Sequence, residues 1–136
     1  MCARDASSNS TEIVRAAIEA RAGAYAPYSN YTVGAALRAV DGQLFTGSNV
    51  ENQSYGLTCC AERVAMFSAV VSGVREFTEI AIATRDGGSP CGACRQVLSE
   101  FCGPDFVIHC VAESGESQSV TLGELFPSPF SSDDLG

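Results

Sequence analysis

The residues of this chain with the greatest capacity for chemistry fall in two short motifs. One reads CAER from Cys60, and the other reads PCGACR from Pro90. Three thiolates from Cys60, Cys91 and Cys94 would leave a tetrahedral zinc ion with one open position, which is typical of a catalytic rather than a structural zinc. Glu62 lies two residues from the first of them, where a carboxylate can move protons on a water in that position. The pattern therefore predicts a catalytic zinc site.

The same cysteines allow two other interpretations. The C-x-x-C spacing of Cys91 and Cys94 at a helix start is also found in redox dithiols. A structural zinc site would need a fourth ligand, which Cys59, Cys102 or Cys110 could supply. The additional motif at another expected helix start favours the catalytic site over both alternatives.

The composition indicates one ordinary globular domain and argues against a nucleic-acid partner. Hydrophobic residues make up 46% of the 136 residues and charged residues 18%, which is enough apolar material for a core. The net charge is −8, from 8 basic and 16 acidic residues. Since a nucleic-acid binder needs a basic surface to neutralise phosphates, a neutral small molecule is the better partner.

The sequence also carries an expectation about location. Residues 1–10 are polar and lack the apolar run of a secretory signal. No stretch approaches the roughly 20 apolar residues of a membrane span. Seven cysteines, an odd number, fit reduced thiols and metal ligands better than a disulfide framework. We therefore expect a cytoplasmic protein without a membrane partner.

Hydrophobic periodicity and turn residues predict the elements that position the two motifs. The expected strands cover residues 33–40, 43–46, 77–84 and 106–111. The expected helices cover residues 11–22, 59–72 and 90–101, and a turn at 114–119 precedes a short helical turn at 121–125. Asp41-Gly42 between the first two strands predicts a tight hairpin. An antiparallel pair followed by crossover helices indicates an α/β fold whose mixed sheet has helices on both faces.

Cap residues and apolar stripes refine the expected helices. Ser10, Thr58 and Ser89 are the expected N-caps of the three helices. The second helix carries an apolar stripe that we expect to face the core, and it consists of Val64, Phe67, Ser68 and Val71.

Both motifs then lie in the first turn of a helix. The helix dipole and the unpaired N–H groups there favour thiolates at Cys60 and Cys91. A zinc ion with three thiolates carries excess negative charge. Arg63, with Arg95 as a second candidate, is expected to offset that charge by hydrogen-bonding the sulfurs.

The chain resembles the small, zinc-dependent, homotetrameric cytidine deaminases. The resemblance covers residues 25–135 and rests on six blocks: APYSNY from Ala26, VGAA from Val33, NVEN from Asn49, CAER from Cys60, PCGACRQ from Pro90 and PFSSDDL from Pro129. A zinc site with three cysteines, a glutamate that is not a ligand and a P-C-x-x-C is a known deaminase pattern. The resemblance implies a three-layer α-β-α sandwich with a mixed sheet of about five strands.

The resemblance also implies an activity. Cysteines matching Cys60, Cys91 and Cys94 bind one Zn²⁺ per chain in that family, and the glutamate matching Glu62 shuttles protons. The implied reaction is hydrolysis of cytidine and 2′-deoxycytidine to uridine and 2′-deoxyuridine plus ammonia, in pyrimidine salvage. Deamination of a cytosine-containing antibiotic is the alternative within the superfamily. A thiol redox or zinc-stabilised binding module is the alternative outside it.

The resemblance implies the substrate contacts as well. Residues matching Asn49 and Glu51 hold the ribose hydroxyls, and the backbone N–H matching Ala61 contacts the pyrimidine O2. Residues matching Tyr55 and Phe130 complete the site of a neighbouring subunit. We therefore expect one domain over residues 1–136 that forms a homotetramer with shared active sites. Residues 1–9 are expected to be disordered, and residues 127–136 to lie at a subunit interface.

Tyr31 is a departure from the family pattern, which usually has phenylalanine at this position. Its ring can still stack on a base, so we expect the activity to be retained. The added hydroxyl needs a hydrogen-bond partner or water, and base affinity is expected to depend on which it finds.

Overall fold

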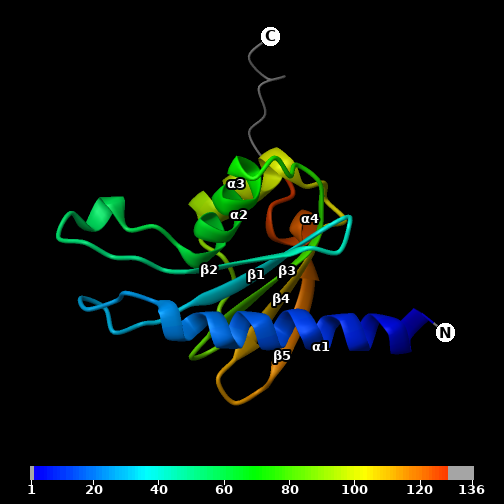
Figure 1. The fold of residues 1–136 in the computed structure, drawn as a ribbon, viewed down its shortest axis with the longest axis horizontal. Helices are drawn as coiled ribbons and strands as arrows, with labels where there is room; N and C mark the ends of the chain where they lie inside the picture. The colour runs from blue at the N-terminus through cyan, green and yellow to red at the C-terminus, as the bar shows by residue number, and fades with distance from the viewer. Residues whose placement is uncertain (1, 129–136) are drawn as a thin grey trace, which may run out of the picture.

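A mixed sheet forms the centre of the protein (Figure 1). The computed structural model describes residues 2–128, with side chains described from residue 11 onward. The strands are β1 (Gly34–Ala39), β2 (Leu44–Ser48), β3 (Phe77–Thr84), β4 (Val107–Ala112) and β5 (Ser117–Thr121). Their order is β2-β1-β3-β4-β5, with β3 and β4 parallel and every other neighbouring pair antiparallel.

Helices cover both faces of this sheet. They are α1 (Cys2–Ala20), α2 (Ala61–Val71), α3 (Gly92–Phe101) and α4 (Leu122–Leu125), with 3₁₀ turns η1 (Arg21–Gly23) and η2 (Tyr55–Leu57). Figure 1 shows α1 crossing one face and α2 and α3 lying on the other. Ile13 and Ala17 of α1 pack on Ala36, Ala81 and Ala83, whereas the opposite face holds the larger core around α2 and α3. The three-layer α-β-α prediction is confirmed.

Helix α1 is longer than the sequence predicts. It begins at Cys2, so its backbone covers residues expected to be disordered, and Ser10 lies inside it rather than at its cap. No glycine or proline occurs between residues 2 and 22 to interrupt a helix. The helix passes at Arg21–Gly23 into η1, close to the expected end.

The apolar stripe predicted for α2 faces the wrong way. The residues that α2 buries are Ala61, Glu62, Ala65, Met66 and Ala69. Phe67 is 44% exposed and Val71 84% exposed. The reason is the close approach of α2 to β2: a Cβ on Gly47 would lie 2.5 Å from the carbonyl oxygen of Ala61. At that distance alanines face the sheet together with the unbranched Met66, whereas Phe67 and Val71 point outward.

The last strand replaces a predicted turn. Residues 117–119, expected in a turn, belong to β5, which pairs antiparallel with β4. The strand is short, polar and at the sheet edge, so its sequence resembles that of a loop. The helical turn expected at 121–125 is present as α4, and Thr121 and Glu124 form a reciprocal capping box at its start.

The described helices include no membrane span. Within residues 2–128 the longest is α1, and neither α1 nor any other helix has the apolar run that crossing a bilayer requires.

Candidate active site

Three segments far apart in the sequence meet at one end of the sheet. Gly34 pairs with both Ser48 and Ala83, so the residues next to these positions lie side by side. A pocket of about 280 Å³ opens there. Its lining includes most residues that the sequence predicts for a site: Tyr31, Asn49, Glu51, Cys60, Ala61, Glu62 and Cys91.

Three sulfur atoms cluster beside this pocket. Cys60 Sγ lies 3.9 Å from Cys91 Sγ, which lies 3.5 Å from Cys94 Sγ, and the three sulfurs are all within 4.8 Å of one another. A tetrahedral zinc with bonds of about 2.3 Å places its sulfur ligands about 3.8 Å apart. Among residues 11–128, the group of potential metal ligands gathered here consists of these three cysteines. A fourth cysteine, as a structural zinc would require, is not part of it.

Helix starts bring the sulfurs together. Cys60 is the N-cap of α2 and Cys91 that of α3, in place of the predicted Thr58 and Ser89. Both cysteines have extended backbones, and neither side chain makes a capping hydrogen bond, so both thiols remain available for a metal. The N–H groups at these ends favour negative charge. Cys94, one turn into α3, is fully buried.

The electrostatics of the cluster indicate that it is built for a cation. The pKa of Cys60 is lowered to about 5, chiefly by its hydrogen bond with Cys94 and then by Arg63. The pKa of Cys94 is raised, because the thiol donates to Cys60 and is itself buried. The protein alone thus supports one thiolate well but not three. A divalent cation would supply the charge that ionises the whole set, so the donor set fits zinc.

Two arginines were candidates for bonding the sulfurs, and the structure distinguishes them. Arg63 Nη2 donates to Cys60 Sγ at 3.2 Å and to the Thr58 carbonyl at 3.3 Å. Arg95 is placed differently and donates to oxygens of the preceding loop and of α4: Pro90 O at 2.8 Å, Ser89 Oγ at 3.0 Å and Leu125 O at 2.9 Å. Arg95 therefore supports the loop that leads into Cys91.

Glu62 lies at the floor of the pocket. It is the second residue of α2, directly after the segment that carries Cys60, and it is 5% exposed. Burial raises the pKa of Glu62, and the negative charge of Cys60 acts in the same direction. A carboxyl group whose pKa is raised toward neutrality can both accept and donate a proton.

Glu51 forms part of the pocket wall as a fixed carboxylate. Its Oε1 accepts from the backbone N–H of Tyr28 at 3.0 Å and of Ser29 at 3.2 Å, and its Oε2 accepts from the Ser29 hydroxyl. These donors, the hydroxyl foremost, hold the pKa of Glu51 below its usual range. The sequence analysis did not predict that Ser29 would hold the Glu51 carboxylate. The position of Ser29 in the APYSNY block was the one feature of the sequence that pointed to it.

Asn49 and Ala61 lie in the same pocket. Asn49 is 7% exposed, accepts from the Val33 N–H at 2.9 Å and donates to the Tyr31 carbonyl at 2.8 Å. One amide hydrogen remains available to a ligand. Ala61 begins α2, where N–H groups have no partner within the helix.

The three predicted aromatic residues have different outcomes. Tyr31 lines the pocket. Tyr55 is 71% exposed and lines a neighbouring hollow together with Glu51, where its ring packs edge-on to Tyr28 at 5.5 Å between centroids. Phe130 lies outside the described residues.

A three-sulfur cluster that fits a metal ion, beside a buried carboxylate at the floor of a small pocket on an α-β-α fold, is the arrangement of a metal-dependent hydrolytic enzyme. The family model for the cytidine and deoxycytidylate deaminase zinc-binding region matches residues 7–110. The chain belongs to the cytidine deaminase family, whose cofactor is zinc.

Curated relatives and solved structures agree with this membership. The chain is 46% identical over 125 residues to the cytidine deaminase of Halalkalibacterium halodurans, covering 90% of this chain and 95% of that protein. It is 46% identical over 119 residues to the cytidine deaminase of Sporosarcina psychrophila, covering 86% and 88%. The crystal structure of cytidine deaminase from Burkholderia pseudomallei superposes with a TM-score of 0.86 at 46% identity, covering 88% of this chain and 98% of that one.

Proposed function

We propose that this chain hydrolyses cytidine and 2′-deoxycytidine to uridine and 2′-deoxyuridine, with release of ammonia, as a step of pyrimidine salvage. The observation that carries the proposal is the position of Glu62 beside the three-sulfur cluster, at the floor of a pocket whose wall presents Asn49 and Glu51. Similar chains that bear the name cytidine deaminase support the choice of substrate.

Cys60, Cys91 and Cys94 would hold the zinc ion. When bound, zinc supplies a Lewis acid that lowers the pKa of water, from 15.7 to about 7 in His-ligated sites. Glu62 accepts a proton from the attacking water and donates it to ring N3 as the water oxygen bonds to C4. Glu62 then carries the second water proton to the exocyclic amine. The C4–N4 bond breaks, and ammonia leaves.

The pocket wall would hold the sugar and the base. Glu51, fixed by the donors around it, can accept a hydrogen bond from a ribose hydroxyl, and Asn49 can donate its remaining amide hydrogen. The N–H of Ala61 would donate to O2 of the base, and the ring of Tyr31 would stack on it. A carboxylate in the wall disfavours a phosphorylated substrate by charge repulsion.

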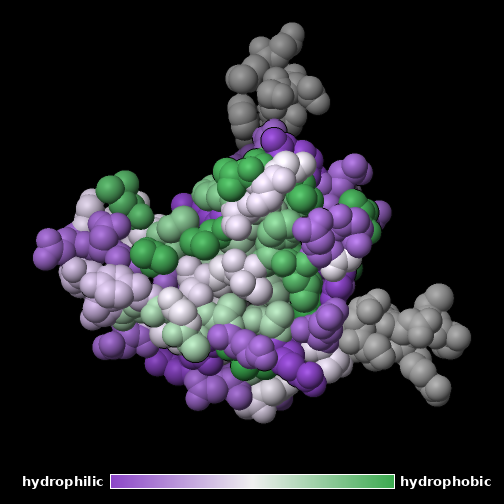
Figure 2. Space-filling view, in the orientation of Figure 1, coloured by the Kyte–Doolittle hydropathy of each residue, from purple (hydrophilic) through white to green (hydrophobic). Residues whose placement is uncertain are grey.

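The active assembly in this proposal is a homotetramer with shared sites. Figure 2 shows hydrophobic side chains exposed over α2 and over the loop that contains η2. Phe67, Val71, Tyr55 and Leu57 are the large exposed residues in these places. Contact with further copies would cover them, and Tyr55 and Phe130 would complete a neighbouring site.

The remaining expectations belong to the same proposal. Residues 1–136 would form one domain, with residues 127–136 at a subunit interface. The cytoplasm is the proposed compartment, because a reducing environment keeps three neighbouring cysteines available to a metal.

The loss of absorbance as cytidine becomes uridine tests the activity, and metal analysis on the same sample tests the cofactor. We expect turnover together with about one zinc ion per chain, as an open catalytic site holds. A metal-free protein that reduces disulfides and leaves cytidine unchanged would favour the redox alternative instead.

A further inference from the structure

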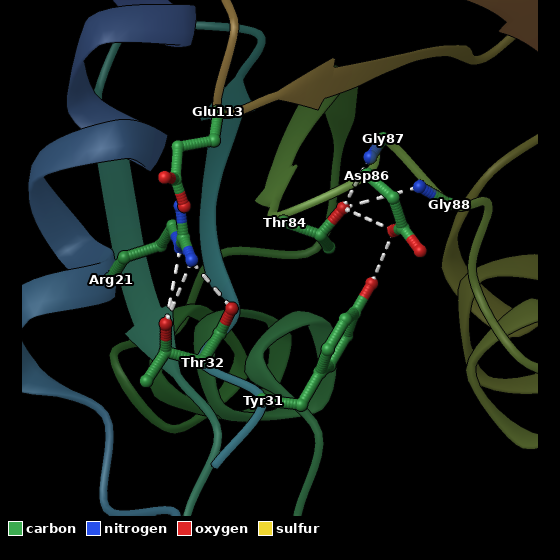
Figure 3. A network of polar contacts seen from close by, with 8 residues as sticks. All are labelled: Arg21, Tyr31, Thr32, Thr84, Asp86, Gly87, Gly88 and Glu113. Carbon is green, nitrogen blue, oxygen red and sulfur yellow. Dashed lines mark hydrogen bonds and ion pairs between the residues drawn. The ribbon is translucent and has the colours of Figure 1, made fainter.

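The hydroxyl of Tyr31, the feature in which this chain departs from the family pattern, has a specific partner. It donates to Asp86 Oδ1 at 2.6 Å (Figure 3). Tyr31 lies before β1, and Asp86 lies just after β3. Residues 88 and 89, which follow Asp86, line the same pocket as the Tyr31 ring. The hydrogen bond therefore joins Tyr31, in the pocket wall, to the loop that supplies residues 88 and 89 to the same wall.

Asp86 belongs to a loop that is held by hydrogen bonds between Thr84 and the residues that follow it. Thr84 Oγ1 accepts from the N–H of Gly87 at 2.7 Å and of Gly88 at 3.1 Å, and the Thr84 hydroxyl donates to Asp86 Oδ1 at 3.3 Å. A Cβ built on Gly88 would lie 3.6 Å from Asp86 Oδ1 and 3.9 Å from the Tyr31 hydroxyl. The backbone at Gly88 thus lies close to the contact between the tyrosine and the aspartate.

The protonation states of the two side chains keep Tyr31 the hydrogen-bond donor and Asp86 the acceptor. Burial and the hydrogen bond with Asp86 raise the pKa of Tyr31, so its hydroxyl stays protonated. The same bond, as the largest cause, lowers the pKa of Asp86, so its carboxylate stays ionised. The guanidinium of Arg85 lies over the Tyr31 ring at 5.3 Å from its centroid, a distance at which a cation attracts an aromatic face.

The loop of residues 85–90 has further anchors. The Glu113 N–H donates to the Arg85 carbonyl at 3.2 Å, Asp86 forms an isolated bridge with Ala112, and Arg95 holds the end that leads to the metal ligands. Arg95 donates to Ser89 Oγ at 3.0 Å and to the Pro90 carbonyl at 2.8 Å, directly before Cys91. Breaking the bond between Tyr31 and Asp86 would therefore leave Cys91 in place and release the loop from the Tyr31 side of the pocket, while Thr84 and Arg95 still hold its two ends.

We propose that Tyr31 and Asp86 form a clasp across the pocket, in which the tyrosine hydroxyl positions residues 85–90 for substrate binding. The clasp acts on substrate affinity and not on the metal or the proton transfer. The inference rests on the proposed function for its kinetic consequence, whereas its structural part stands independently of the activity.

The test uses the zinc-loaded protein and the variants Tyr31→Phe, Asp86→Ala and the double variant. Tyr31→Phe keeps the ring and its contact with Arg85 and removes the hydroxyl alone. We expect KM for cytidine to rise roughly three- to tenfold in either single variant, the size of one hydrogen bond to a partly exposed carboxylate. The double variant should be no worse than Asp86→Ala alone, because Asp86→Ala already removes the bond to the Tyr31 hydroxyl. Zinc content should not change, and kcat should stay within about twofold of wild type.

Two matched variants separate the clasp from general effects. Asp105→Asn removes an exposed carboxylate beyond the far end of α3 and should leave KM unchanged. Asp86→Asn keeps an acceptor for the Tyr31 hydroxyl and should restore part of the affinity lost in Asp86→Ala.

Amide hydrogen exchange measures the stability of the loop independently of enzyme activity. Peptides covering residues 84–90 should exchange faster in Tyr31→Phe than in wild type, and this measurement decides the structural part even if wild type fails to turn over cytidine. Unchanged exchange in this segment would overturn the clasp. Faster exchange with an unchanged or lower KM, in an enzyme that does deaminate cytidine, would overturn its role in substrate binding while leaving the proposed function intact.

Discussion

Adding one methyl group at Gly47 is expected to disable the site from outside the pocket. A Cβ there would lie 2.5 Å from the carbonyl oxygen of Ala61 and 2.5 Å from the backbone nitrogen of Ala65. Ordinary contact begins at 3.4 Å, so the first turn of α2 must move by about 0.9 Å. Both atoms belong to the backbone, so no change of side-chain rotamer can relieve the clash. The segment that moves also carries Cys60 and Glu62.

Two magnitudes follow from that displacement. Overpacking of a filled interior costs about 1–3 kcal/mol of unfolding free energy. A misplacement of about 1 Å can cost about 10²-fold in catalysis. Gly47→Ala should therefore lower kcat/KM for cytidine about 10²-fold, a far larger loss than its modest destabilisation alone would produce in a protein that remains folded.

The assay combines spectrophotometric turnover, thermal unfolding and zinc content on the same preparation. Gly103→Ala is the matched control, because a Cβ there meets nothing within 4 Å. Its activity and Tm should stay close to those of wild type. If Gly47→Ala kept the activity and Tm of Gly103→Ala, α2 would not lie on β2 as closely as described, and the reasoning about how Glu62 is placed would fail.

Three further predictions concern Glu62, Glu51 and the proposed assembly. Glu62→Gln should retain zinc and lose roughly 10²–10⁴-fold in kcat; more than about a tenth of the wild-type rate would exclude its proton-shuttle role. The lowered pKa of Glu51 means that its ionised form stabilises the fold above the usual carboxyl range, and this contribution is lost as the pH falls through the lowered value. Ser29→Ala removes the largest cause, so its Tm deficit relative to wild type should stay level from about pH 7 to about pH 5 and shrink as the pH falls below about 4; a deficit that stayed constant below about pH 4 would contradict the linkage. Phe67→Asp on the exposed face of α2 should reduce the native mass in analytical ultracentrifugation, and an unchanged mass would remove that face from the interface.

Elements with strong and agreeing local signals could be predicted from the sequence. Strand β3 is predicted with both of its bounds, because an apolar run rich in isoleucine and alanine ends at a polar loop. The hairpin at Asp41-Gly42 is present as well, with Gly42 at φ +97°, a conformation that favours glycine. In both cases the residues that determine where the element begins or ends are close neighbours in the sequence.

Helix α2 shows where such reasoning fails. Its sequence has two apolar faces, one of alanines with Met66 and one with Phe67 and Val71. Size favours the second as the core face, but the distance between helix and strand selects the first. That distance is set by Gly47 on a different element, so no periodicity within the helix could reveal it. The helix starts were misplaced for a related reason: Thr58 is a good cap by type, but the chain turns helical only after Cys60.

The pocket itself depends on strand register, which the sequence specifies weakly. Gly34 pairs with Ser48 of β2 and with Ala83 of β3. This pairing places Val33, Asn49 and Thr84 side by side at one end of the three strands. A slip of one residue would turn every side chain of a strand to the opposite face and separate Asn49 from the loop that leads to Cys91. The cysteine motifs could be assigned to a metal because the residue types and their spacing within each motif already indicate metal ligands. The hydrogen bond between Tyr31 and Asp86 joins residues that flank different strands, so the pairing of those strands must be known before the bond can be found.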